Sequence, residues 1–276
     1  VGHWNARFAE GARVTLFADL RAYRGTLLPL KASGHTYAAE VDSQPCNWDN
    51  LEMRIDERCH ALEDLLRLGI HVGDFIAVDA QPDIMENGFI VSRHLDDKAG
   101  VAVLLGAIKA LMESGVKLPL DCHPLFTISE EVGSGASGVL HGDVSEMLTL
   151  DNGTTAPGQN SSEYGVTICM ADMSGPFDYH LTHRLLQICQ EFEIPHQRDI
   201  FRYYRSDSAA AVEAGNDLRT ALAAFGVDAS HGWERIHSNA LVSLAQLVCL
   251  YLQSPPLYER DKQARGPLLG FPNMPG

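Results

Sequence analysis

The chain has 276 residues, of which 45% are hydrophobic and 21% charged, a composition typical of a globular protein with one large or two smaller domains. Its formal net charge of -15 argues against nucleic acid and anionic membranes as partners, because both would repel it. The six cysteines form no Cys-x-x-Cys pair, and we see neither a signal peptide nor an apolar stretch long enough to span a bilayer. We therefore expect a cytoplasmic protein with reduced thiols.

The first 83 residues are predicted to form a small β-rich domain. Short apolar runs at 14–17, 23–30, 37–41, 51–55 and 75–78 are separated by Gly, Pro, Asn or Asp. This spacing is typical of a small barrel or sandwich. One helix is predicted over residues 57–68, where leucines group on one side before Gly69.

From Gly88 the pattern changes to alternating strands and long helices, which predicts an α/β domain over residues 84–276. The predicted strands are 89–92, 125–129, 147–150, 166–170, 200–204 and 220–227. The predicted helices are 97–112, 177–192, 208–214 and 238–252. Beyond residue 261 the chain is rich in Pro and Gly and is predicted to be irregular.

Polar side chains follow four of these strands, and ligands of open α/β sheets gather at the carboxyl ends of the strands. Each side chain alone is better explained as a solvated cap. Together they offer the carboxylate oxygens and imidazole nitrogens that suit a divalent metal such as zinc, cobalt or manganese. The residues, in chain order, are His94, Asp96, Asp97, Glu130, Glu131, Asp151, His231 and His237.

The adjacent pair Glu130-Glu131 offers two functions at one strand end. Neighbouring residues of an extended chain point in opposite directions, so one carboxylate can bind a metal while the other takes a proton from water.

Four motifs resemble, in order and spacing, those of the M42 family of dinuclear metallo-aminopeptidases, which includes glutamyl and tetrahedral aminopeptidases. The resemblance implies a mixed-sheet α/β metallopeptidase domain carrying a small β-rich, barrel- or PDZ-like insert domain at residues 1–83. It also implies dimerisation through that insert and homo-oligomers from dimers to dodecamers. The motifs are Leu95-Asp96-Asp97-Lys98-Ala99-Gly100, Glu130-Glu131-Val132-Gly133, Asp151 and Arg235-Ile236-His237-Ser238.

The same resemblance implies a ligand set for two divalent ions, whether zinc, cobalt or manganese. Asp96 would bridge the two ions, Glu131 and Asp151 would each hold one, and His237 would complete the second.

The implied catalytic residue is Glu130, as the general base for a metal-bound hydroxide, with Asp97 and Asp207 in supporting positions. Asp207 is the one residue here that matches the family's Gly-Thr-Asp turn. The expected function is a metal-dependent aminopeptidase, a hydrolase that removes N-terminal residues from peptides or splits a similar small amide.

One family ligand is missing, namely a His in a His-x-Asp segment that precedes the insert. Val1-Gly2-His3-Trp4 resembles the entry of the insert, so we expect an N-terminal part of the protein to precede Val1. His94 stands two residues before Asp96, but the family match assigns a packing role to the residues before Asp96. A catalytically inactive structural or assembly subunit is therefore an alternative function.

A second alternative comes from Gly133-Ser134-Gly135-Ala136-Ser137-Gly138, which fits the Gly-x-Gly-x-x-Gly pattern of dinucleotide-binding oxidoreductases. Asp151 follows at about the distance of a ribose-binding acid. Against it, Glu130 and Glu131 stand between the strand and the glycines, where their charge would repel a pyrophosphate.

Overall fold

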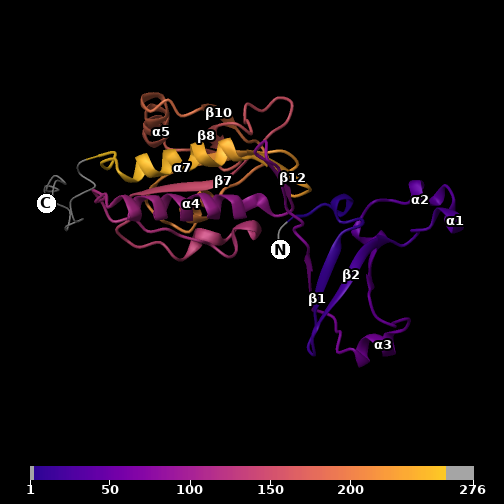
Figure 1. Cartoon of the computed structure of the whole chain (residues 1–276). Helices are drawn as coiled ribbons and strands as arrows, with labels where there is room; N and C mark the ends of the chain where they lie inside the picture. The colour runs from indigo at the N-terminus through magenta and orange to yellow at the C-terminus, as the bar shows by residue number, and fades with distance from the viewer. Residues whose placement is uncertain (1–2, 259–276) are drawn as a thin grey trace, which may run out of the picture. The chain divides into compact units, whose positions relative to one another are not determined.

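The computed structural model describes residues 3–258 (Figure 1). The chain divides into two compact units, and each is described by itself. The first unit comprises Val1–Asp96 and Ala229–Arg235, and the second comprises Asp97–Asp228 and Ile236–Gly276. Within the described range, no helix is long and apolar enough to cross a membrane.

The first unit is built on an antiparallel sheet of order β3-β2-β1-β4. Alternation along β1 and β2 turns Val14, Leu16, Tyr23 and Leu27 inward, where they form the core of this unit. A second sheet has the order β12-β6-β5. Strands β5 and β6 and the first two residues of β12 lie in this unit. The strands are β1 (Arg13–Phe17), β2 (Ala22–Pro29), β3 (Leu51–Ile55), β4 (Phe75–Val78), β5 (Asp83–Ile84), β6 (Phe89–Ser92) and β12 (Glu234–His237).

Two predictions for this unit were wrong. Residues 37–41 form no strand; they span the end of α1 (Gly34–Tyr37) and the start of α2 (Glu40–Ser43), two short helices whose residues are nearly all exposed. The predicted helix 57–68 shortens to α3 (Leu62–Arg67). It begins there because the Asp64 carboxylate accepts the N–H groups of His60 and Ala61, which fixes the first turn.

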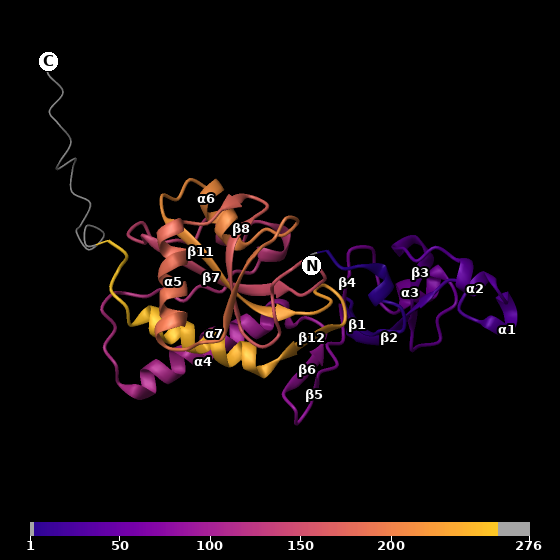
Figure 2. The ribbon, with the colours of Figure 1, turned by 90° about the horizontal axis from the view of Figure 1, so that it is seen from above.

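The second unit is built on a mixed sheet of order β10-β8-β11-β7, with short β9 paired to β8 (Figure 2). Strand β11 runs parallel to β7 and antiparallel to β8, and β10 runs parallel to β8. The bounds are β7 (Glu146–Thr154), β8 (Val166–Asp172), β9 (Gly175–Pro176), β10 (His196–Ile200) and β11 (Arg219–Val227). The strand predicted at residues 200–204 is observed at residues 196–200, as β10.

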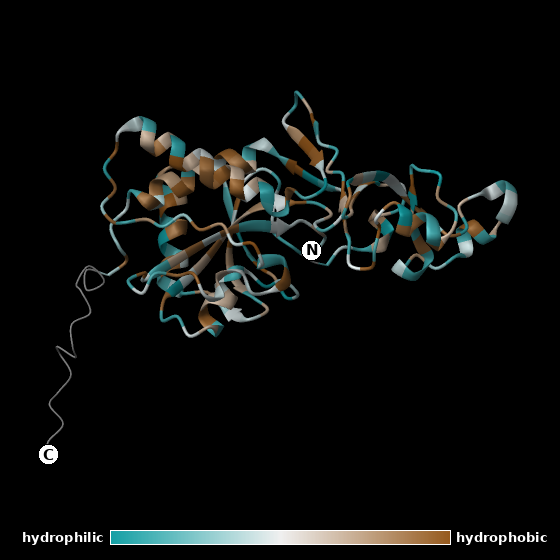
Figure 3. Cartoon of the chain, turned by 90° about the horizontal axis from the view of Figure 1, so that it is seen from below, coloured by the Kyte–Doolittle hydropathy of each residue, from teal (hydrophilic) through white to brown (hydrophobic). Residues whose placement is uncertain are grey.

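Helices cover this sheet as the periodicity predicts. Helices α5 and α7 pack on each other and on β8 and β11, whereas α6 contacts β7 and β11. Their buried faces include Leu181, Leu185, Leu244 and Leu247. Figure 3 shows hydrophobic residues, in brown, along much of the long helices. The bounds are α4 (Leu95–Ser114), which enters this unit at Asp97, α5 (Tyr179–Glu191), α6 (Asp207–Glu213) and α7 (Ser238–Leu252).

The predicted strand 125–129 was wrong. The residues alternate as a strand would, with Leu125 and Thr127 half-buried and Phe126 and Ile128 exposed, Ile128 to 98%. Within residues 3–258, however, no strand pairs with this segment. A cavity whose lining includes both this segment and β7 leaves the segment without a hydrogen-bonded neighbour.

Candidate functional site

In the first unit, a buried carboxylate organises the turn that holds Asp96. Glu234 on β12 is 1% exposed, and its Oε2 accepts the N–H groups of Leu95 at 2.6 Å and Asp96 at 3.0 Å. Its Oε1 accepts the N–H of His231 at 2.9 Å. Burial raises the pKa of Glu234 to about 7. Glu234 therefore ties two chain segments together at Asp96. The sequence analysis missed it, although it lies three residues before His237.

His94 was considered a substitute ligand, and its imidazole has a different contact. Its Nε2 lies 3.2 Å from the carbonyl oxygen of Val78, and its ring lies near that of Trp4. The residue adopts a left-handed backbone with φ of 64°. His94 thus links the turn before α4 to strand β4 of the same unit.

In the second unit, Glu130 and Glu131 lie in a single 3-10 turn, Glu130–Val132. Gly133 ends the turn in the left-handed region with φ of 80°, and its N–H donates to the carbonyl of Glu130 at 2.7 Å. Both carboxylate residues are half-buried and line the same cavity. Gly133 therefore ends the turn that holds the pair at the cavity wall.

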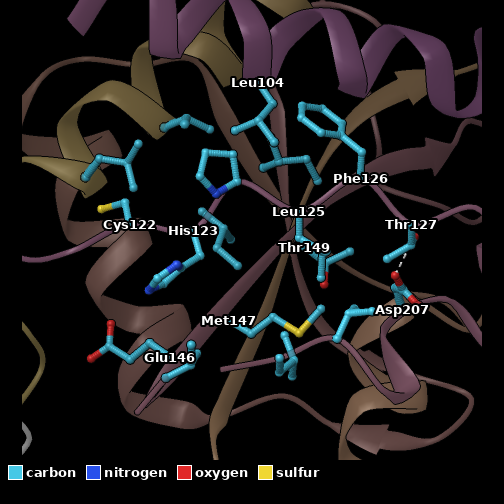
Figure 4. Close-up of a pocket in the computed structure, with 18 of the residues that line it drawn as sticks. Leu104, Cys122, His123, Leu125, Phe126, Thr127, Glu146, Met147, Thr149 and Asp207 are labelled. Carbon is cyan, nitrogen blue, oxygen red and sulfur yellow. Dashed lines mark hydrogen bonds between the residues drawn. The ribbon is translucent and has the colours of Figure 1, made fainter. Parts of the chain in front are cut away.

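Asp207 at the start of α6 pins the loop that carries this pair. Its carboxylate accepts the hydroxyl of Thr127 at 2.8 Å and the N–H of Ala136 at 2.7 Å (Figure 4). A Cβ at Gly135 would lie 2.5 Å from the carboxylate, so a glycine is required there. The glycine motif 133–138 thus encloses an aspartate of its own chain, which disfavours an anionic pyrophosphate in the same loop.

Asp151 lies in the middle of β7 and is 5% exposed. Its Oδ1 accepts the backbone N–H of Asn152 at 2.7 Å and the Asn152 side-chain amide at 3.2 Å. These two donors fix the carboxylate's rotation, so that its second oxygen is held in a defined direction.

His237 is buried at the end of β12 and caps helix α7. Its Nδ1 accepts the N–H of Asn239 at 3.1 Å, and its ring lies 4.9 Å from that of Tyr164. Because a backbone amide can only donate, Nδ1 carries a lone pair in this arrangement. A neutral imidazole then has its proton on Nε2.

A cavity of about 1200 Å³ in the second unit brings several predicted residues together. Its lining includes the apolar side chains of Leu104, Leu125 and Met147 (Figure 4). The acidic residues predicted for this unit all line it, namely Asp97, Glu130, Glu131, Asp151 and Asp207. Asp97 is itself held at the start of α4, where its Oδ1 accepts the N–H of Gly100 at 3.1 Å.

Comparison with known proteins identifies relatives along almost the whole chain. The family model for M42 glutamyl aminopeptidase matches residues 1–247. YhfE of Bacillus subtilis, named as an aminopeptidase, is 40% identical over 238 residues, which cover 86% of this chain and 68% of that protein.

Solved structures agree with the mixed α/β fold predicted from the sequence. A TET aminopeptidase from a marine-sediment thaumarchaeon matches with a TM-score of 0.77 at 17% identity, over 91% of this chain and 73% of that one. An aminopeptidase of Desulfurococcus kamchatkensis matches with a TM-score of 0.75 at 22% identity, over 98% of this chain and 75% of that one.

Proposed function

Because the chain belongs to the M42 glutamyl aminopeptidase family, a family of peptide hydrolases, we propose that it removes N-terminal residues from peptides in a metal-dependent reaction. The observation that carries the proposal is the single cavity lined by Glu130, Glu131 and Asp151. Three carboxylates beside one solvent-accessible space are costly unless a cation or proton balances them.

The proposed metal ligands are Asp96, Glu131, Asp151 and His237, which would hold two divalent ions. Asp96 fits this role, since its side chain is 5% exposed and its Oδ2 has no hydrogen-bond partner among the described residues. Oxygen and imidazole ligands suit zinc, cobalt and manganese alike. When bound, such ions make water more acidic and polarise the scissile carbonyl.

The proposed catalytic residue is Glu130. Its carboxylate takes a proton as water attacks the peptide carbonyl, and it returns that proton to the amine as the C–N bond breaks. Asp207 keeps the Glu130 loop in place through Thr127 and Ala136, and Asp97 orders the first turn of α4. Both are therefore proposed as positioning residues that do not touch the substrate.

The proposed partner, besides a peptide or small amide, is a second copy of this chain, through the insert domain at residues 1–83. Phe17 and Phe75 stand opposite each other on β1 and β4 and are 54% and 73% exposed, an apolar surface suited to burial. The TET1 peptidase of Pyrococcus horikoshii, with a TM-score of 0.73 at 22% identity, is described as assembling into a tetrahedron or an octahedral shell.

The test is metal analysis of the purified full-length protein, together with a screen of aminoacyl substrates. We expect bound divalent metal and release of N-terminal residues, both lost after chelation. Glu130→Gln should abolish turnover and leave metal content normal. Substantial activity in Glu130→Gln rejects this residue as the base. A metal-loaded protein that cleaves none of the substrates supports the non-catalytic subunit instead.

A further inference from the structure

A second pocket lies at the β10 edge of the sheet in the second unit. Its volume is about 560 Å³, within the range of roughly 300–1,000 Å³ that small-molecule sites occupy. It shares no lining residue with the cavity of the proposed catalytic site. Its walls are the carboxyl-terminal parts of the parallel strands β8 and β10 and the loop 157–160. Ligands of α/β sheets gather at such strand ends, so the pocket has the place of a binding site.

The pairing of β8 with β10 contains a β-bulge at this pocket. Cys169 pairs with Asp199, but Ile200 pairs with Ala171 and leaves Met170 as an extra residue of β8. A bulge bends its strand and re-aims a side chain, and bulges are frequent beside active sites. The irregular pairing thus accompanies an apolar residue, Met170, in the pocket wall.

The loop that forms another wall has a defined turn at its start. Pro157 and Gly158 are the central residues of this turn, and the N–H of Gln159 donates to the carbonyl oxygen of Ala156 at 3.0 Å. Gly158 has φ of 95°, which a type II turn requires at its third residue and which glycine adopts without strain. The side-chain amide of Gln159 donates to the carbonyl oxygen of Ile200 at 3.2 Å. The chain's own contacts thus fasten the loop to β10, so a ligand would meet a wall that is already formed.

Asp199 is the one acidic residue in the lining of this pocket, and the loop takes up its charge. Its carboxylate accepts the backbone N–H groups of Asn160, Ser161 and Ile200, each at 2.8 Å. The residue is 8% exposed. Backbone amides that donate to a carboxylate stabilise its negative charge. Asp199 therefore needs no guanidinium to balance it.

Two arginines line the same pocket, Arg198 on β10 and Arg202 just after it, and both are exposed. Neither guanidinium forms an ion pair or a hydrogen bond with any residue in the described part of the chain. Arg205, in contrast, pairs with Glu213. A guanidinium presents its N–H donors as a planar fork that matches the oxygen atoms of a carboxylate or a phosphate. The pocket therefore offers two such forks that no acidic side chain of the described residues occupies.

We propose that this pocket binds a small dianion, whose carboxylate or phosphate oxygens lie between Arg198 and Arg202. Two guanidiniums match two negative charges, and the apolar residues Pro157, Met170 and Ile200 line the same space. The rival explanation is that the two guanidiniums extend separately into water, as exposed arginines commonly do. The two explanations differ in whether a dianion binds in a saturable way and whether both arginines are needed.

The experiment is calorimetric titration of the full-length protein with glutarate and, separately, with inorganic phosphate. Chelator-treated protein is used, so that the proposed metal site offers no cation to either anion, and ionic strength is held constant at a mildly alkaline pH where both are dianions. We expect saturable binding that Arg198→Met and Arg202→Met each weaken by at least about tenfold, because each removes a charged donor and keeps an unbranched side chain. The matched control is Arg184→Met on α5, which removes an arginine that also lacks an ion pair among the described residues but lies outside the pocket. Its affinity should equal that of the wild-type protein.

Binding of glutarate alone identifies the ligand as a carboxylate, and binding of phosphate alone identifies it as a phosphate. A wild-type protein that binds neither dianion overturns the inference, as does binding that both arginine variants leave unchanged. If the variants do not fold, ¹H–¹⁵N spectra of the wild-type protein decide the question. The amide resonances of Gly158 and Asn160 should move during the titration while that of Gly215 stays, and stationary loop resonances reject the site. Peptide hydrolysis enters none of these measurements, so their failure leaves the proposed function intact.

Discussion

The carboxylate of Glu234 accepts the backbone N–H of Asp96 at 3.0 Å, and the same oxygen accepts that of Leu95. These two amides begin helix α4, where N–H groups have no partner within the helix. A residue far along the chain thus supplies the cap. The position of the Asp96 carboxylate therefore depends on Glu234.

The stability of the metal-free protein should depend on pH through Glu234. Burial raises its pKa from 4.5 to about 7, so between these values the unfolded chain loses a proton that the folded chain keeps. The stabilising contribution is complete below 4.5 and is lost as pH rises through about 7. This difference in pKa corresponds to at most about 3 kcal/mol in the free energy of unfolding. Urea unfolding from about pH 4.5 to pH 7.5 measures it, and Glu234→Gln should flatten the wild-type slope. An equal slope in both proteins contradicts the assignment.

Removal of the Asp207 carboxylate should loosen the loop that carries Glu130 and Glu131. Asp207→Ala leaves the buried N–H of Ala136 without its acceptor, which costs about 1–3 kcal/mol. We expect faster amide exchange across residues 129–137 and a lower kcat, measured by hydrogen exchange and steady-state kinetics. Thr127→Val removes only the hydroxyl partner and should have the smaller effect on both. Unchanged exchange in Asp207→Ala would show that the loop is held by other contacts.

The sequence was sufficient for the elements whose periodicity is local. Helix α7 was predicted with the bounds that it has, and β11 differs by one residue, because a long apolar stripe or run identifies each one. Residues 125–129 have the same kind of apolar run, but a strand also needs a partner, and partners are not readable from the run itself. Short segments such as 37–41 failed for the same reason.

The site was predictable where a motif carries it and unpredictable where a long-range contact does. Glu130, Glu131 and Asp151 were named from their places at predicted strand ends, and Asp207 from the family resemblance; all four line one cavity, and their roles stay predictions. Glu234 gave no such signal, because its role arises from a contact with Asp96 on a distant segment. The ring orientation of His231 likewise depends on the His3 carbonyl. The sequence shows only that this glutamate lies three residues before the motif histidine His237.

Asn152 should tune the proposed metal affinity of Asp151. Its side-chain amide and backbone N–H both donate to Asp151 Oδ1, so Asn152→Ala removes one of two bonds that fix the carboxylate. We expect a loss of about tenfold in metal affinity, typical of residues that orient a ligand. Asn160→Ala, which removes an amide bonded to the Arg198 carbonyl, is the matched control. Calorimetry that finds the same loss in both variants would show an effect unrelated to Asp151.

His237 has a cap role and a proposed ligand role, and two substitutions separate them. Asn is a strong N-cap, so His237→Asn should keep the hydrogen bond from the Asn239 N–H. His237→Ala should lose this bond, which lowers the free energy of unfolding by about 1 kcal/mol. Both variants lack the imidazole and should bind metal equally weakly.

The measurements are thermal unfolding of the metal-free proteins and calorimetric titration with Zn²⁺. If the cap alone mattered, His237→Asn would bind metal as the wild-type protein does. An ion can bind Nε2 of the neutral ring only if the ring proton moves from Nε2 to Nδ1. Nδ1 then no longer accepts the N–H of Asn239, so that hydrogen bond must break. Metal binding by the wild-type protein should therefore make the amide of Asn239 exchange faster, whereas in His237→Asn its exchange should not respond to metal.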